Sequence, residues 1–292
     1  MKSGHDKRDG MTRREAIGTG LAAAVALGRP GSLTALGAVD PSPYGPFRMG
    51  LQSYSLRGYT ADNKPDVKKA LETTRSLGIT YWEAYPAHLP MTTDPAAIAG
   101  YKASTAAAGV KVVGYGVNRF SKDHDANRKL FEFARAMGLE YMSADPTPDS
   151  FDSLDKLVEE YGVAIGIHNH GPGHRYALID TISAAIKDHN PKIGCCVDTG
   201  HFLRSNEDPV RAVEVFGKRV FGVHLKDVKD ARTFTILGKG DLRTVDLLKA
   251  LAKQDYRNCL ALEYEEHPQD PYDDIRECLA AAREAVAKAV SV

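Results

Sequence analysis

A regular alternation of two sequence patterns constrains the fold of this chain more than any other feature. Short apolar runs alternate with segments in which apolar residues recur at helical spacing, from about residue 48 onward. Apolar runs bounded by turn residues are typical of buried strands, and a 3.6-residue period is typical of helices. The expected strands are 48–56, 79–85, 111–117, 139–145, 163–170, 192–201, 220–227 and 259–265, and the expected helices are 64–77, 95–108, 125–137, 150–161, 176–187, 209–216, 244–254 and 271–287. Such alternation predicts parallel strands joined by crossover helices.

The number of strand–helix units favours a closed barrel. Eight units in about 245 residues match a (β/α)8 barrel better than an open doubly wound sheet. No Gly-x-Gly-x-x-Gly follows the first apolar run, so a dinucleotide-binding fold lacks its main sequence signal. Glycines precede four expected strands, where they would end the preceding helix: Gly78, Gly109, Gly138 and Gly162. We therefore predict an α/β chain whose single domain, residues 48–292, is a (β/α)8 TIM barrel.

The N-terminus has the composition of an export signal. Residues 1–16 are polar and basic and include Arg13 and Arg14, residues 17–27 are small and apolar, and residues 35–38 offer small residues near a possible cleavage point. This order predicts a twin-arginine-type signal peptide and leader over residues 1–38, and hence a periplasmic or other extracytoplasmic location. An alternative is a short amphipathic helix of a cytosolic protein. The apolar run is shorter than the roughly twenty residues of a stable membrane span. Whether the signal is cleaved stays open.

Composition limits the partners of the chain. Lys plus Arg and Asp plus Glu both number 38, so the net charge is zero, which argues against a dedicated nucleic-acid or anionic-membrane surface. The four cysteines form no Cys-x-x-Cys motif, and the adjacent Cys195 and Cys196 would face opposite sides of a strand. We expect buried, reduced thiols. The sequence does not determine the oligomeric state.

Acidic and imidazole side chains stand where the expected strands end. They are Glu83, Asp145, His168, His170, Asp198, His201, His224 and Glu263. Active sites of such barrels lie at the carboxyl ends of the strands, and small residues two positions earlier would leave room for ligands there. Carboxylates gathered in a dry barrel mouth require a cation. Mixed oxygen and nitrogen donors without cysteine suit one divalent ion, Mn²⁺, Co²⁺, Mg²⁺, Fe²⁺ or Zn²⁺.

From about Met49 onward, these motifs resemble the xylose isomerase-like barrel superfamily, in particular its sugar phosphate isomerase/epimerase branch. The resemblance implies one divalent metal held by the last four strands. Its ligands would be Asp198 in Asp-Thr-Gly-His, His224 in His-Leu-Lys-Asp and Glu263 in Leu-Glu-Tyr. Epimerases usually place a Glu on the fifth strand, whereas this chain has His168 in His-Asn-His, which is similar to inosose dehydratase-like and 3-keto-glycoside-processing members. The remaining ligand is therefore His168, with Asp145 as a second candidate.

The resemblance implies a metal-dependent isomerase, epimerase or lyase that acts on a carbonyl sugar or 3-keto-glycoside. A metal-bound carbonyl acidifies the neighbouring C–H, and a base then gives an enediolate. Reprotonation isomerises or epimerises the sugar, and loss of a β-substituent makes the enzyme a dehydratase. His170 and Glu263 are the candidate proton carriers, and Lys226 is the candidate for stabilising negative charge.

Four further residues are candidates for substrate binding: Glu83, His201, Trp82 and Arg175. His201 could instead orient Asp198. Trp82 precedes Glu83 by one residue and would face the opposite side of its strand. Arg175 could equally belong to the loop before the next helix.

Two other functions are compatible with this fold. An abasic-site endonuclease would need more metal ligands and a basic surface, and the zero net charge disfavours it. A non-catalytic sugar-binding barrel would keep the site without turnover. We expect a small non-phosphorylated sugar or glycoside as substrate, because an exported enzyme rarely meets sugar phosphates.

Overall fold

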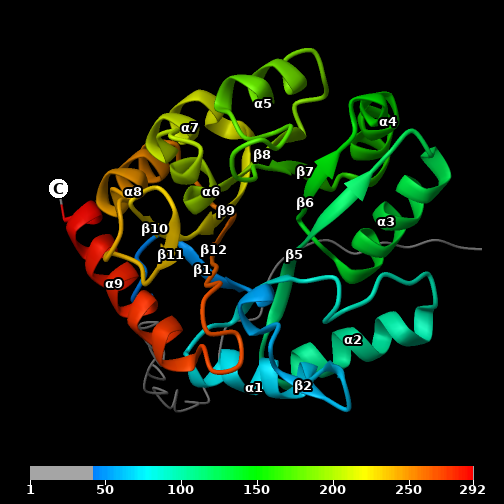
Figure 1. The fold of residues 1–292 in the computed structure, drawn as a ribbon. Helices are drawn as coiled ribbons and strands as arrows, with labels where there is room; N and C mark the ends of the chain where they lie inside the picture. The colour runs from blue at the N-terminus through cyan, green and yellow to red at the C-terminus, as the bar shows by residue number, and fades with distance from the viewer. Residues whose placement is uncertain (1–41, 292) are drawn as a thin grey trace, which may run out of the picture. The chain divides into compact units, whose positions relative to one another are not determined.

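The computed structural model describes residues 42–291, which form a closed barrel of eight parallel strands (Figure 1). The strands are β1 (Arg48–Gln52), β4 (Tyr81–Ala84), β5 (Lys111–Phe120), β6 (Tyr141–Pro146), β7 (Ala164–His168), β8 (Ile193–Asp198), β9 (Val220–Leu225) and β12 (Cys259–Leu262). They pair in the order β1-β12-β9-β8-β7-β6-β5-β4, and β4 pairs with β1 to close the ring. The predicted TIM barrel is confirmed.

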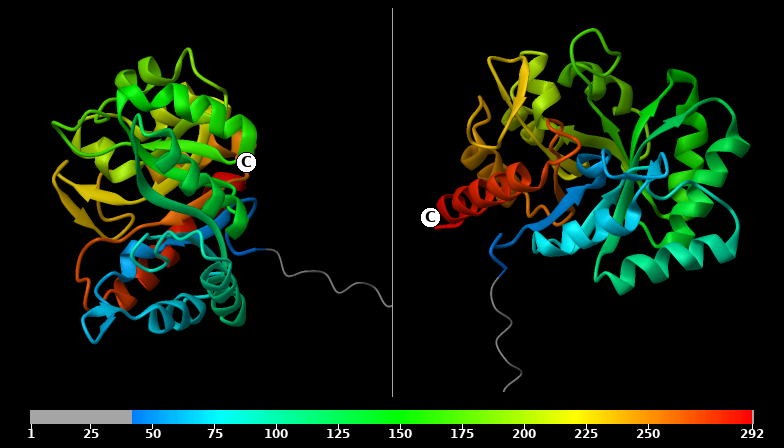
Figure 2. Two further views of the ribbon diagram at one scale, coloured as in Figure 1. Left: turned by 90° about the vertical axis from the view of Figure 1, so that its right-hand side faces the viewer. Right: turned by 60° about the horizontal axis from the view of Figure 1, so that its bottom comes forward.

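The helices lie outside the ring of strands (Figure 2). They are α1 (Val67–Ser76), α2 (Pro95–Ala107), α3 (His124–Met137), α4 (Phe151–Tyr161), α5 (Ile179–Ile186), α6 (Thr199–Arg204), α7 (Pro209–Phe216), α8 (Thr244–Lys253) and α9 (Tyr272–Val290). Helix α7 has the predicted bounds because Asp208 caps its first turn and Pro209 begins it. Helices α3 and α4 end at Gly138 and Gly162, whose φ angles of 78° and 73° lie in the left-handed region that favours glycine.

Alternate residues of each strand face the two sides of the barrel wall. On β9, Val223 and Leu225 belong to the large core between strands and helices, whereas Gly222 faces the barrel interior. A smaller cluster inside the barrel is built around Tyr141. A Cβ atom at Gly222 would lie 2.7 Å from Cε2 of Tyr141, so this ring takes up the room that the glycine leaves.

Several strands end earlier than the apolar runs that predicted them, and β1 and β8 show why. Strand β1 stops at Gln52, whose side chain accepts a hydrogen bond from the amide of Tyr54, and residues 53–56 form a 3-10 turn. Strand β8 stops at Asp198, whose side chain caps α6. His201 therefore lies on a helix, so the prediction of a strand over 192–201 was wrong at its end. The short hairpins β2–β3 (Thr60–Ala61, Lys64–Pro65) and β10–β11 (Asp227–Lys229, Thr233–Thr235) were not predicted.

Other sequence predictions concern the cysteines, a membrane span and the N-terminus. All four cysteines are buried and free, as expected. Among the described residues, no helix combines the length and the apolar character that crossing a membrane requires. The predicted signal over residues 1–38 lies outside the described residues, so it stays a prediction, as does the domain boundary at residue 48.

Candidate metal centre

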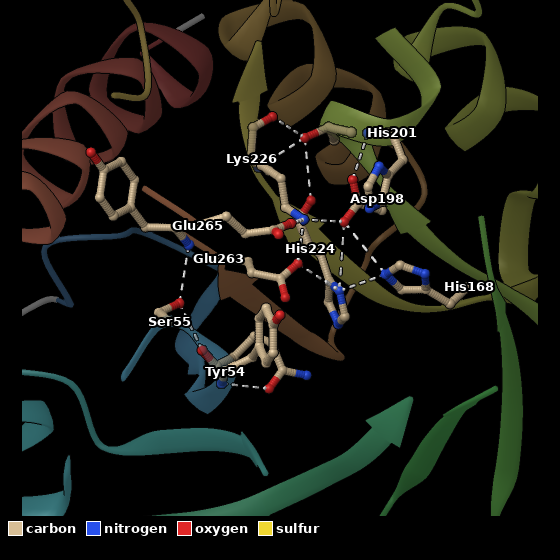
Figure 3. Close-up of polar contacts among 12 residues, drawn as sticks. Tyr54, Ser55, His168, Asp198, His201, His224, Lys226, Glu263 and Glu265 are labelled. Atoms are coloured by element: carbon tan, nitrogen blue, oxygen red, sulfur yellow. Dashed lines mark hydrogen bonds and ion pairs between the residues drawn. The ribbon is translucent and has the colours of Figure 1, made fainter. Parts of the chain in front are cut away.

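Four buried side chains from consecutive barrel strands bring one donor atom each to a common point (Figure 3). His168 ends β7, Asp198 ends β8, His224 lies on β9, and Glu263 directly follows β12. Their donor atoms all lie within 4.8 Å of one another. The structure thus brings together the four residues that the sequence analysis named as metal ligands.

The spacing of these atoms fits the shell of a small divalent ion. His168 Nε2 lies 3.0 Å from His224 Nδ1 and 3.4 Å from Asp198 Oδ2, and His224 Nδ1 lies 3.3 Å from Glu263 Oε2 and 3.8 Å from Asp198 Oδ2. Metal–ligand bonds of about 2.1 Å place neighbouring donors roughly 3.0–3.4 Å apart in octahedral or tetrahedral shells. Asp198 Oδ2 and Glu263 Oε2 are buried and face the two imidazole nitrogens, and the ammonium of Lys226 lies 2.9 Å and 2.7 Å from them. Two such oxygens beside two imidazole nitrogens are a donor set that a divalent cation would satisfy.

Asp198 is held in place by local hydrogen bonds. Its Oδ1 atom accepts the backbone amide of His201 (2.7 Å) at the start of α6, which leaves Oδ2 for the cluster. Asn169, the middle residue of His-Asn-His, binds both backbone groups of Asp198: its Nδ2 donates to the carbonyl (2.8 Å) and its Oδ1 accepts the amide (2.7 Å). Asn169 therefore fixes the end of β7 to the end of β8. The sequence analysis had not singled out this residue.

Glu83 lies behind His224, within the barrel. Its Oε2 atom is 2.9 Å from His224 Nε2, and its two oxygens accept hydrogen bonds from Gln52, Tyr141 and Ser143. A proton on Nε2 leaves the lone pair of Nδ1 directed at the cluster, which is the usual role of a carboxylate beside a metal-binding histidine. Glu83 is fully buried, and its binding of a substrate hydroxyl stays a prediction.

Lys226 is a buried ammonium within the same cluster. Its Nζ atom lies 2.9 Å from Asp198 Oδ2 and 2.7 Å from Glu263 Oε2, and it also donates to Glu265. Burial alone would lower the pKa of Lys226, but Asp198 and Glu263 outweigh it and raise the pKa above its ordinary value. Burial raises the pKa of Asp198, but Lys226, His201 and His168 together outweigh burial and lower the pKa, so the carboxyl stays ionised.

Three more histidines lie beside His168. The ring of His170 is 4.7 Å from that of His168 and 4.3 Å from that of His174, and His201 lies 5.8 Å from His170. Burial lowers the pKa of both His170 and His201 to about 3. These two imidazoles are therefore neutral near pH 7, and each can donate or accept a hydrogen bond.

The structure does not bring three other candidates into the cluster. Asp145 lies 3.5 Å from His174 and is not among the four converging side chains. Trp82 faces outward, where it is fully buried and donates to Thr74 of α1, which corrects its assignment to substrate binding. Arg175 is exposed and donates to the carbonyl of Pro146.

Several residues near the cluster were missed by sequence reasoning. Tyr54, in the turn after β1, packs edge to face on Tyr85 at 4.9 Å between ring centroids, and its pKa is raised by burial. Phe234 of the β10–β11 hairpin lies 4.9 Å from Nζ of Lys226, measured to the ring centroid. Strand parity places Glu265 on the same face as Glu263, two residues before it, but the sequence analysis assigned Glu265 no role. The two aromatic residues lie in segments that carry no such signal.

Comparison with known proteins places the chain among barrels of this kind. The sequence profile of the xylose isomerase-like TIM barrel family matches residues 71–285. An inosose dehydratase of Clostridium botulinum is 27% identical over 139 residues, which cover 41% of this chain and 46% of that protein. The rhizopine catabolism protein MocC of Rhizobium meliloti is 28% identical over 137 residues, 41% of this chain and 42% of that protein. The chain therefore spans less than half the length of these curated relatives.

Solved structures share the fold over most of the chain. A D-tagatose 3-epimerase-like protein superposes with a TM-score of 0.65 and 17% identity, over 84% of this chain and 100% of that chain. The 3-keto-D-glucoside 4-epimerase of E. coli gives a TM-score of 0.63 and 15% identity, over 82% and 99% of the two chains. At these identities the comparison establishes the architecture.

Proposed function

The chain belongs to the xylose isomerase-like TIM barrel family, and on that premise we propose that it is a divalent-metal-dependent isomerase, epimerase or lyase of carbonyl sugars. One observation carries the proposal: two carboxylate oxygens and two imidazole nitrogens converge at the carboxyl ends of four consecutive strands. His168, Asp198, His224 and Glu263 would hold the ion. A bound divalent cation supplies Lewis acidity that makes a C–H bond beside a carbonyl easier to break.

The side chains around the cluster supply the proton chemistry. Glu263 directs Oε2 at the cluster, where it lies 3.3 Å from His224 Nδ1 and 2.7 Å from Lys226 Nζ, so its other oxygen is the candidate proton acceptor at carbon. His170, with an unpartnered Nδ1, is the candidate second proton carrier. Lys226 keeps a positive charge beside Glu263 and would stabilise negative charge on a substrate oxygen.

We favour a reaction that includes elimination. Curated relatives include inosose dehydratases, and His168 stands where the resemblance would place a Glu. Epimerisation by two opposed glutamates would lack its second glutamate in this chain. The proposed substrate is a free keto-inositol, keto-sugar or 3-keto-glycoside, since the proposed export argues against sugar phosphates.

Proton exchange at carbon tests the proposal whatever the final product is. Protein loaded with Mn²⁺ is incubated in D₂O with an inosose, a 3-keto-glucoside or phosphorylated ketoses, and deuterium at the carbon beside the carbonyl is followed by NMR. We expect exchange with at least one free carbonyl sugar, loss of exchange in Glu263→Gln, and no loss in the control Glu72→Gln on α1. Fully metal-loaded protein that exchanges no carbonyl sugar would refute the proposal. Exchange with phosphorylated ketoses alone would refute the substrate class.

We also propose that residues 1–38 direct export through a twin-arginine pathway. The Arg13–Arg14 pair before the apolar residues 17–27 supports this interpretation. Fusion of residues 1–38 to a reporter that is active only after export tests it. We expect export with the natural sequence and none with Arg13→Lys/Arg14→Lys. Equal export of both fusions would contradict the twin-arginine assignment.

A further inference from the structure

The ammonium of Lys226 contacts the same oxygens that would hold the ion. Its Nζ atom lies 2.9 Å from Asp198 Oδ2 and 2.7 Å from Glu263 Oε2, two of the four converging donor atoms (Figure 3). Two cations so close to the same oxygens repel each other strongly in a buried site. A divalent ion at the cluster therefore requires something that draws the ammonium away from these oxygens.

Glu265 provides that attraction from the outer side of the cluster. It also accepts a hydrogen bond from Lys226 Nζ, and its side chain is 20% exposed, against 8% for Glu263 and 0% for Asp198. Phe234 adds a second attractive surface, because Lys226 Nζ lies 4.9 Å from the centroid of its ring. Movement toward Glu265 thus carries the ammonium outward and away from the ligand oxygens.

The carboxylates in contact with Lys226 leave a net charge that matches one divalent ion. Asp198, Glu263 and Glu265 together carry three negative charges, and Lys226 returns one positive charge. The remaining two negative charges match one divalent ion. Glu83 is a further carboxylate that lies behind His224 (2.9 Å), and Gln52, Tyr141 and Ser143 donate hydrogen bonds to its oxygens.

Thr199 and Gly200 of the Asp-Thr-Gly-His motif hold the backbone and stem of Lys226 in place. Thr199 Oγ1 accepts the backbone amide of Lys226 (2.9 Å) and donates to its carbonyl. Gly200 leaves room for the stem of the lysine, since a Cβ atom there would lie 2.8 Å from Lys226 Cδ. The backbone and stem of Lys226 are therefore held in place, and the position of its ammonium depends on the carboxylates around it.

We propose that Glu265 is a positioning residue of the metal centre, which holds the Lys226 ammonium clear of Asp198 and Glu263 so that a divalent ion can bind them. This inference rests on the proposed function, because it assumes that the four-residue cluster holds the ion. It assigns Glu265 to the site and gives Lys226 the role of an internal competitor of the metal.

Metal affinity in charge variants tests the proposal without measuring turnover. Full-length protein stripped of metal is titrated with Mn²⁺ by calorimetry at one fixed pH. We expect Glu265→Gln to weaken binding about 10–100-fold, the usual effect of losing a residue that supports a metal ligand. We expect Lys226→Met to tighten binding about tenfold or more, because the competing charge is gone. The double variant should bind within a few-fold of the wild type.

The two single variants are expected to change the Mn²⁺ affinity in opposite directions, and this distinguishes a positioning role of Glu265 from a merely structural one. If both residues only supported the fold, each single variant would bind more weakly and the double variant most weakly. Weaker binding in Lys226→Met, or unchanged binding in Glu265→Gln, would overturn the proposal. If Lys226→Met does not fold, Lys226→Gln replaces it, and if neither folds, the result for Glu265→Gln decides alone.

Matched controls keep the outcomes distinct. Glu266→Gln removes the next carboxylate along the chain, and Lys229→Met removes an exposed lysine; neither should change the affinity for Mn²⁺. Wild-type protein that binds no divalent ion would overturn the proposed metal centre together with this inference. Binding by the wild type with no response to Glu265→Gln would overturn this inference alone.

Discussion

Replacing Glu83 by Gln removes one charge from the barrel interior without changing the size of the side chain. Oε1 accepts hydrogen bonds from Gln52 Nε2 (3.0 Å) and from the hydroxyl of Ser143, and Oε2 accepts the hydroxyl of Tyr141 and lies 2.9 Å from His224 Nε2. The two hydroxyls can rotate to accept a bond from the new amide. The side-chain nitrogens of Gln52 and His224 cannot accept a bond from the new amide in the same way. The oxygen of Gln52 already accepts a backbone amide, so its nitrogen stays directed at residue 83. His224 Nε2 could accept only if its proton moved to Nδ1, which faces the cluster.

The environment of Glu83 determines how much Glu83→Gln should reduce stability and Mn²⁺ affinity. Burial raises the pKa of this carboxyl, but His224, Ser143 and Tyr141 outweigh burial and lower the pKa below its ordinary value. The charged form is therefore favoured in the folded state, and Glu83→Gln should reduce the free energy of unfolding by about 1.5–3 kcal/mol, the worth of one charge-assisted hydrogen bond. Loss of the fixed His224 tautomer should weaken Mn²⁺ binding about 10–100-fold.

Urea unfolding and calorimetric titration with Mn²⁺ measure the two effects. Glu72→Gln serves as the matched control, because Glu72 is exposed on α1 and only forms a distant pair with Lys68 (3.8 Å). We expect the control to match the wild type in both assays. Unchanged Mn²⁺ affinity in Glu83→Gln would refute the argument that Glu83 directs His224 at the cluster.

Three further results are expected. Removal of metal by a chelator should lower the melting temperature, since a ligand at a thousand times its Kd stabilises a protein by about 4 kcal/mol; equal melting with and without Mn²⁺ would contradict this. Asp227 accepts hydrogen bonds from four backbone amides of residues 228–242, so Asp227→Asn should speed hydrogen exchange of these amides, whereas Asp241→Asn should not. Arg48 holds the pKa of Glu140 below its ordinary value of 4.5, so the pair stabilises the fold above about pH 4.5 and this contribution is lost as the pH falls through the lowered pKa. Glu140→Gln should therefore be less stable than the wild type at pH 7, with a difference that shrinks toward pH 3 in urea unfolding.

The fold was accessible from the sequence because it follows from periodicity, whereas the ligand set rested on a family resemblance. Strand–helix alternation fixes a parallel sheet, and parallel strands present their carboxyl ends on one side. The acidic and imidazole side chains at the strand ends were therefore expected on one side of the barrel, and the resemblance identified Asp198, His224 and Glu263 as ligands. Strand parity placed Trp82 on the face opposite Glu83, and the structure confirms that it faces the helices.

How deep a side chain lies in the barrel, and which side chain it contacts there, could not be predicted from periodicity. Parity put Glu83 inside the barrel, but only barrel closure puts it 2.9 Å from His224, behind the cluster. Strand β8 ends at Asp198 because this residue caps α6. With six residues, α6 is too short for a helical period to be recognised in the sequence. The contact between Lys226 and Glu265 joins residues 39 positions apart, and no local pattern signals it.

Metal content measured in three proteins tests the central claim, a single divalent ion held by residues of the last four strands. Wild type, His168→Ala and Asp145→Ala are equilibrated with Mn²⁺, freed of excess metal and analysed for bound manganese per chain. The account predicts one ion per chain in the wild type and in Asp145→Ala, and a clear loss in His168→Ala. A wild type that retains no ion, or a loss in Asp145→Ala with full occupancy in His168→Ala, would contradict it.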